Sequence, residues 1–94
     1  MSNPSALHVV IHGHVQGVFF RAFVAKKASD LELNGWVRNL PSGEDVEVQV
    51  EGNREKLEKM LDLLKTGPPA AVVDKVIPTW SKYTNKYTHF SVRD

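Results

Sequence analysis

The chain of 94 residues contains no cysteine, and this absence removes several kinds of site at once. Disulfide bonds, zinc–thiolate centres and a thiol nucleophile are excluded. A chain without cysteine also suits a reducing compartment, so we expect a cytoplasmic location. No apolar run approaches the roughly 20 residues that a membrane-spanning helix needs. The first five residues lack the pattern of a signal peptide. We therefore expect no membrane association.

Acidic residues are missing from positions 1–29, which hold three basic residues, whereas positions 30–94 hold nine basic and eleven acidic residues. The N-terminal third therefore carries net positive charge and the rest carries net negative charge. A basic segment of this size favours a small anion as the ligand. It is too weakly charged for a nucleic-acid-binding surface, which usually has a strongly basic face. We expect no nucleic-acid partner.

Clusters of carboxylates that could hold a metal ion are also absent from the sequence. His8 and His12 share one face of a predicted strand, and His14 follows, a spacing that could suit zinc. Because Gly13 interrupts the strand and no third ligand is evident, we favour exposed polar side chains over a metal site. The sequence predicts neither a metal nor a cofactor.

The residues that are present describe one ordinary globular domain, 1–94, in which we expect residues 1–6 to be flexible. Alternating apolar residues predict strands, and apolar spacings of three or four predict helices. Pro78 puts the fourth strand at an edge or at a strand end. This β-α-β-β-α-β order is typical of the ferredoxin-like α+β sandwich, with two helices on one face of an antiparallel sheet. Strands are expected at 7–12, 35–40, 46–51, 72–80 and, as a short fifth strand, 88–92; helices are expected at 20–29 and around 57–64.

The segment 13–21, GHVQGVFFR, connects the first strand to the first helix. A strand-to-helix turn directs several backbone N–H groups into one hollow, where the helix dipole adds positive potential. Arg21 ends the segment with forked donors that fit two phosphate oxygens. The loop therefore predicts a binding site for a phosphate-like anion.

The predicted topology brings a second segment to the same place. In a split βαβ unit, the strands 7–12 and 35–40 run parallel with another strand between them. Their C-terminal ends therefore share one edge of the sheet. We expect the loop after the first strand to converge there with Arg38 and Asn39.

These two segments, 13–21 and 35–39 (GWVRN), resemble the two signature segments of the acylphosphatases. The similarity extends through the hairpin at 43–52 and the stretch 67–76, and it covers residues 7–92. The chain departs from the family pattern at 29–34 and at 83–89, which contain no residue assigned to chemistry.

The resemblance implies a small cytosolic enzyme without metal or cofactor that hydrolyses acyl phosphates, the mixed anhydrides of a carboxylic acid and phosphate. It implies that Arg21 and Asn39 are catalytic. It further implies that backbone amides of the loop bind the substrate phosphate, namely those of Val15, Gln16, Gly17, Val18, Phe19 and Phe20. Small size and a balanced surface make a monomer the expected state.

The residue chemistry is compatible with that reaction. Phosphoryl transfer mostly needs positioning and charge stabilisation, which Arg21 and a ring of N–H groups could supply. Asn39 is no base, but its amide can hold a water in line with phosphorus. The carboxylate leaving group departs without an acid. We expect a phosphate oxygen to take the water's proton and no covalent intermediate to form.

Alternative interpretations of these residues remain open. Arg21 could be a surface residue of the first turn, and Asn39 could simply start a turn. RNA binding is disfavoured because the strand 46–51 has no aromatic residue and its outward residues are two acids and a glutamine. The alternative that we keep is a non-catalytic domain that binds phosphate or carbamoyl phosphate.

Overall fold

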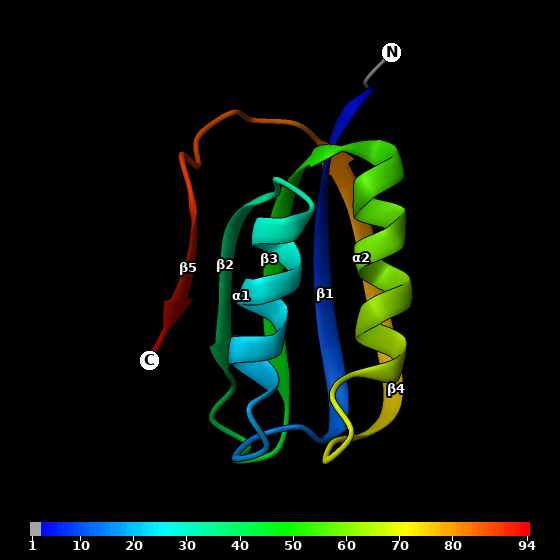
Figure 1. Ribbon diagram of the computed structural model, residues 1–94, viewed down its shortest axis with the longest axis vertical. Helices are drawn as coiled ribbons and strands as arrows, with labels where there is room; N and C mark the ends of the chain where they lie inside the picture. Colours follow the sequence, from blue (N-terminus) through cyan, green and yellow to red (C-terminus); the bar gives the residue numbers. More distant parts are fainter. Residues whose placement is uncertain (1–2) are drawn as a thin grey trace.

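The computed structural model describes residues 3–94, which form one sheet covered on one face by two helices (Figure 1). Every predicted strand and helix is present, with boundaries that differ by a few residues. Neither helix among the described residues is long and apolar enough to cross a membrane. The elements are β1 (Pro4–His14), α1 (Phe20–Asp30), β2 (Asn34–Asn39), β3 (Val46–Asn53), α2 (Arg54–Thr66), β4 (Val72–Lys82) and β5 (Phe90–Arg93).

The sheet has the strand order β4-β1-β3-β2-β5. Because β3 is antiparallel to both β1 and β2, these two strands run parallel, as the sequence predicts. Strand β4 lies at an edge, which accommodates Pro78. One expectation is wrong: β5 pairs parallel to β2, so the sheet is mixed rather than antiparallel throughout. The reason is visible in Figure 1, where the connection from β4 crosses one end of the sheet and approaches β2 from its N-terminal side.

The core lies between the sheet and the helices, and its faces are those that the periodicity predicts. The alternating valines of β3 and the odd-numbered apolar residues of β1 are fully buried. The helices contribute apolar residues spaced three or four apart. This packing fixes the orientation of α1 against β2 and β5. The helical core residues are Phe20, Val24, Ala28, Leu57, Met60 and Leu64.

The strand β1 begins earlier than expected. Residues 4–6, which we expected to belong to a flexible segment, pair with β3, and Ser5 and Ala6 also pair with β4; Ser5, for example, lies opposite both Gly52 and Lys82. The expectation for residues 1 and 2 lies outside the described residues.

A second correction concerns Glu51, which we expected to face water. It lies on the helix-free face of the sheet but is only 3% exposed. The segment after β4 crosses over it, and the carboxylate accepts hydrogen bonds from Thr84 N (3.2 Å), Thr84 Oγ1 (2.7 Å) and Asn85 N (3.1 Å). A buried carboxylate requires such donors, because burial removes its hydration. The segment 83–89, which departs from the family pattern, therefore has a structural role: it supplies hydrogen-bond donors to the buried carboxylate of Glu51.

Candidate active site

The loop 15–19 joins the end of β1 to the start of α1. Gly17 and Phe19 both adopt left-handed backbone conformations, with φ of 71° and 61°. These two residues reverse the chain, and Phe19 O then accepts the hydrogen bond from Phe23 N (3.0 Å) that begins the helix. Among residues 3–94, no protein acceptor is found for the amides of residues 16–20. The amide of Val15 differs, because it donates to Glu44 O at 3.4 Å.

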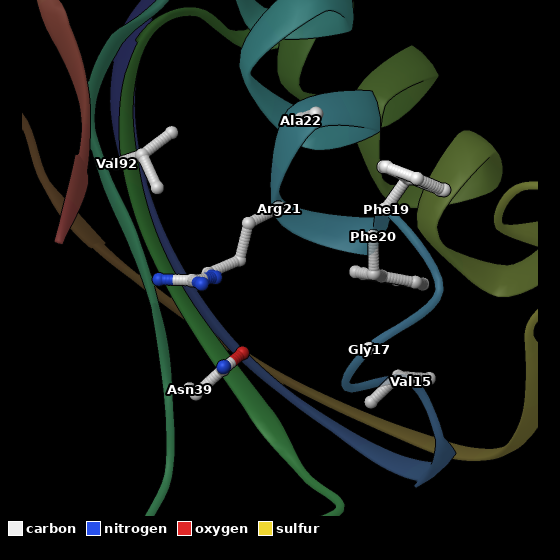
Figure 2. Close-up of a pocket in the computed structure, with 8 residues that line it drawn as sticks. All are labelled: Val15, Gly17, Phe19, Phe20, Arg21, Ala22, Asn39 and Val92. Carbon is white, nitrogen blue, oxygen red and sulfur yellow. The ribbon is translucent and has the colours of Figure 1, made fainter. Parts of the chain in front are cut away.

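Arg21 lies in the first turn of α1, and its side chain extends toward β2 and β5 (Figure 2). Its Nη1 donates to Arg93 O at 2.8 Å and lies 3.6 Å from Asp94 Oδ1. The side chain is half-buried. Nε and Nη2 have no protein acceptor among the described residues, so the backbone of β5 orients a guanidinium whose other donors remain available.

Asn39 is the last residue of β2. Its Oδ1 atom is buried and has no hydrogen-bond partner within the described part of the chain. A buried acceptor without a donor costs about 1–3 kcal/mol. The turn after β2 is closed by backbone hydrogen bonds from Leu40 N to Asp45 O and from Gly43 N to Leu40 O, without the Asn39 side chain. The structure therefore does not support a turn-forming role for this side chain.

A hollow of about 360 Å³ brings Arg21 and Asn39 together, as the topology predicts. Figure 2 shows the two side chains entering it from α1 and from β2. Ala22 and Val92 also contribute to its wall, and the sequence did not indicate either of them. Gln16 and Val18 are not among the lining residues. The hollow is lined by Val15, Gly17, Phe19, Phe20, Arg21, Ala22, Asn39 and Val92.

The side chain of Gln16 has a function that sequence reasoning missed. Its Nε2 donates to Leu40 O at 2.9 Å and to Asp45 O at 2.8 Å. Both N–H bonds of one amide therefore tie the loop to the turn that directly follows Asn39. Periodicity could not find this contact, because it does not indicate which turn lies opposite which loop.

Asp45 supports the start of the loop from the same turn. Its Oδ1 accepts from Gly13 N at 3.4 Å, and its Oδ2 lies 3.0 Å from His12 Nδ1. Burial raises the pKa of Asp45, but the hydrogen bonds from His12 and from Gly13 outweigh it, so the pKa is lowered overall. The carboxyl is therefore ionised at neutral pH. The role of Asp45 was also not indicated by the sequence.

The histidines of the zinc alternative are engaged elsewhere. His8 Nε2 lies 2.6 Å from Glu47 Oε2, and His12 contacts Asp45. Both imidazoles thus contact carboxylates on the helix-free face rather than being merely exposed polar groups. Within residues 3–94, no three His, Cys, Asp or Glu side chains form a group that could hold a metal ion.

The chain is similar to proteins of a known family over almost its whole length. The acylphosphatase family model matches residues 7–92. An acylphosphatase of Caldivirga maquilingensis is 44% identical over 93 residues, which cover 99% of this chain and 98% of the relative. The crystal structure of an acylphosphatase from Bacillus subtilis matches with a TM-score of 0.91 at 32% identity, over 96% of this chain and 99% of that one.

A larger protein also contains a similar domain. Full-length HypF, solved in a phosphate- and nucleotide-bound form, matches all of this chain with a TM-score of 0.88 at 30% identity, over 12% of its own length. The full-length relatives define the class as hydrolases that act on acid anhydrides. The chain belongs to the acylphosphatase family, and its reaction is the hydrolysis of acyl phosphates.

Proposed function

We propose that the hollow binds the phosphate of an acyl phosphate through the amides of residues 16–20 and the guanidinium of Arg21. The observation that carries this proposal is the convergence in one hollow of donors without protein partners and a buried acceptor, Asn39 Oδ1. The amides of residues 16–20 are the donors that the geometry leaves available, and Val15 is engaged with Glu44. The N-terminus of α1 adds positive potential at the same point.

In this mechanism Asn39 orients the attacking water. Its Oδ1 accepts one hydrogen bond from the water, which holds the water's lone pair toward phosphorus. The new bond forms between the water oxygen and phosphorus, and the bond from phosphorus to the acyl oxygen breaks. The carboxylate leaves with the electron pair, and the water's proton passes to a phosphate oxygen. The products are a carboxylate and inorganic phosphate.

The enzyme forms no covalent intermediate in this scheme. The residues that line the hollow include no serine, threonine, histidine, lysine or carboxylate that could attack phosphorus. Arg21 and the loop amides stabilise the charge that develops on the phosphoryl oxygens, which is the contribution that phosphoryl transfer needs most. We propose that this charge stabilisation replaces a metal ion. We also propose that the protein is a monomer and acts in the cytoplasm.

The experiment that tests the proposal measures hydrolysis of benzoyl phosphate in excess EDTA by the wild type and by Arg21→Ala. We expect fast hydrolysis by the wild type and a loss on the order of a thousandfold in the variant, because the variant lacks the cation that stabilises the transferring group. Lys26→Ala is the matched control, since Lys26 is an exposed cation on the same helix that pairs with Asp30.

Three results would contradict the mechanism. Activity that EDTA abolishes and a divalent cation restores would require a metal. Equal losses in Arg21→Ala and Lys26→Ala would indicate a general field effect instead of a specific contact. A folded wild type without any turnover would favour the non-catalytic phosphate-binding alternative.

A further inference from the structure

We propose that Trp36 is a positioning residue for the reaction, because its ring anchors Arg93 and thereby holds the carbonyl that orients Arg21. This inference rests on the proposed function, since it explains how the cation that the mechanism uses is kept in place. The two residues of this anchor lie on neighbouring strands, Trp36 on β2 and Arg93 at the end of β5. Neither lines the hollow, so we expect neither to touch the substrate.

Arg93 connects the two faces of the sheet. Its carbonyl oxygen accepts the hydrogen bond from Arg21 Nη1 at 2.8 Å. The preceding residue, Val92, lines the hollow, so the alternation along β5 directs the Arg93 side chain to the helix-free face. There its guanidinium carbon lies 4.6 Å from the centre of the Trp36 ring. A contact on the helix-free face therefore fixes a carbonyl that acts on a side chain of the hollow.

The end of β5 has few other contacts that could hold it. The strand has four residues, lies at the edge of the sheet and pairs with β2 on one side (Figure 1). Phe90 at its start packs against the core, whereas Arg93 is exposed, and no hydrogen bond or ion pair of its guanidinium is found among residues 3–94. Segments with few buried contacts open locally with small free energies. The stack on Trp36 is the side-chain contact that keeps Arg93 in place beside Arg21.

The Trp36 ring is itself held by its surroundings. It is half-buried, and the guanidinium carbon of Arg38 lies 5.4 Å from the ring centre. Arg38 Nε donates to Glu47 Oε1 at 2.5 Å, and Glu47 Oε2 lies 2.6 Å from His8 Nε2. The face of an aromatic ring attracts a guanidinium electrostatically. A ring that is fixed in this way offers Arg93 one position, which is what an anchor requires.

The consequence for the reaction follows from the geometry at Arg21. Its Nη1 is engaged with Arg93 O, while Nε and Nη2 remain available for the phosphate. If the end of β5 moves, the guanidinium loses the acceptor that fixes its plane, and its free donors no longer converge on the hollow. Because stabilisation of the transition state depends on that orientation, we expect the loss mainly in kcat.

The test measures kcat and KM for benzoyl phosphate at a temperature at which every variant is folded. In Trp36→Leu and in Arg93→Gln we expect kcat to fall about fivefold, the factor that corresponds to one exposed cation–π contact. Both variants retain the Arg93 carbonyl, and Trp36→Leu changes no charge, so a weaker field would not explain a loss that the two share. Trp36→Phe and Arg93→Lys keep a ring and a cation, and each should restore kcat to within about twofold of the wild type.

Coupling to Arg21 distinguishes positioning from a general structural role. In the Arg21→Ala background, Trp36→Leu should cause no further loss of kcat, because the group that it positions is absent. Trp80→Leu is the matched control, since Trp80 also stacks on an arginine, with the Arg54 guanidinium carbon 3.5 Å from its ring centre, but lies on β4 outside the hollow. This control should lower the melting temperature and leave kcat unchanged.

Three results would overturn the anchor while the proposed function stands. They are wild-type kcat in both Trp36→Leu and Arg93→Gln beside a large loss in Arg21→Ala, equal losses of kcat in Trp36→Leu and Trp80→Leu, and a loss in Trp36→Leu that persists in the Arg21→Ala background. If Trp36→Leu does not fold, Arg93→Gln on the exposed edge strand gives the answer. Wild-type activity of Arg21→Ala would instead overturn the proposed function, and the anchor with it.

Discussion

The two ends of the sheet differ in whether their buried polar groups have hydrogen-bond partners. Where β1 and β2 end, Asn39 Oδ1 has no hydrogen-bond partner in the described chain, and the amides of residues 16–20 have no protein acceptor. At the other end, Glu51 is only 3% exposed, but its carboxylate accepts hydrogen bonds from Thr84 and Asn85. Satisfied groups stabilise the fold, whereas unsatisfied groups lower its stability and remain available to a ligand.

This contrast separates the parts of the molecule that serve binding from those that serve folding. Changes at the loop end should alter activity more than stability, and changes at the Glu51 end should alter stability more than activity. Gln16 serves both binding and folding, since its hydrogen bonds stabilise the turn and also position the loop beside Asn39.

The largest effect in this series is expected for Asn39→Ala. Activity should fall on the order of a hundredfold, because the attacking water is no longer held in position. The free energy of unfolding, measured by urea denaturation, should stay the same or rise, since the substitution removes a buried acceptor without a partner. A large loss of stability together with activity would mean that Asn39 is a structural residue.

The next effect is expected for Glu51→Gln, which tests the opposite end. The amide retains one acceptor oxygen but turns an N–H group toward the donors of Thr84 and Asn85. We expect a loss of roughly 2–3 kcal/mol in unfolding free energy, with nearly unchanged kcat/KM below the melting temperature. Glu44→Gln is the control, since Glu44 is exposed. Loss of activity without loss of stability would remove the distinction between the two ends.

A smaller, mixed effect is expected for Gln16→Ala. Loss of two hydrogen bonds to backbone carbonyls should cost about 1–2 kcal/mol of stability. It should also raise KM and lower kcat together, by about tenfold in kcat/KM, because the loop and Asn39 are no longer held in register. A change in stability alone, with wild-type kinetics, would show that the loop keeps its position without this side chain.

The smallest effect is a dependence of stability on pH. Burial raises the pKa of Glu47, but hydrogen bonds from His8 and Arg38 outweigh it and lower the pKa overall. A carboxyl with a lowered pKa stabilises the fold above its ordinary pKa of 4.5, and this contribution is lost as the pH falls through the folded-state value. Urea denaturation from about pH 5 downward should show a loss of less than about 1 kcal/mol from this group. Glu47→Gln should flatten that part of the profile; an unchanged slope would assign the dependence to other carboxyls.

The sequence predicted the parts of the fold that depend on local patterns. The alternating valines of β3 and the odd-numbered apolar residues of β1 predicted which side of the sheet faces the core. The split βαβ order also predicted that Arg21 and Asn39 would meet at one edge. These features follow from residue spacing and from the parallel direction of β1 and β2.

The parts that were missed all depend on contacts between distant segments. The parallel direction of β5 follows from the path of the connection over the sheet, which a local pattern does not record. The burial of Glu51 results from that same connection. The contacts of Gln16 and Asp45 join the loop to a turn more than twenty residues away in the chain. Residue type alone does not reveal such partners.

The most direct test of the central claim is a titration of the isotope-labelled protein with inorganic phosphate, followed by the backbone and side-chain amide signals in NMR spectra. The account predicts that the largest shifts occur at the amides of residues 16–20 and at the side-chain amide of Asn39, with little change at Thr84 and Asn85. Shifts centred on the helix-free face of the sheet, or none at millimolar phosphate, would contradict it.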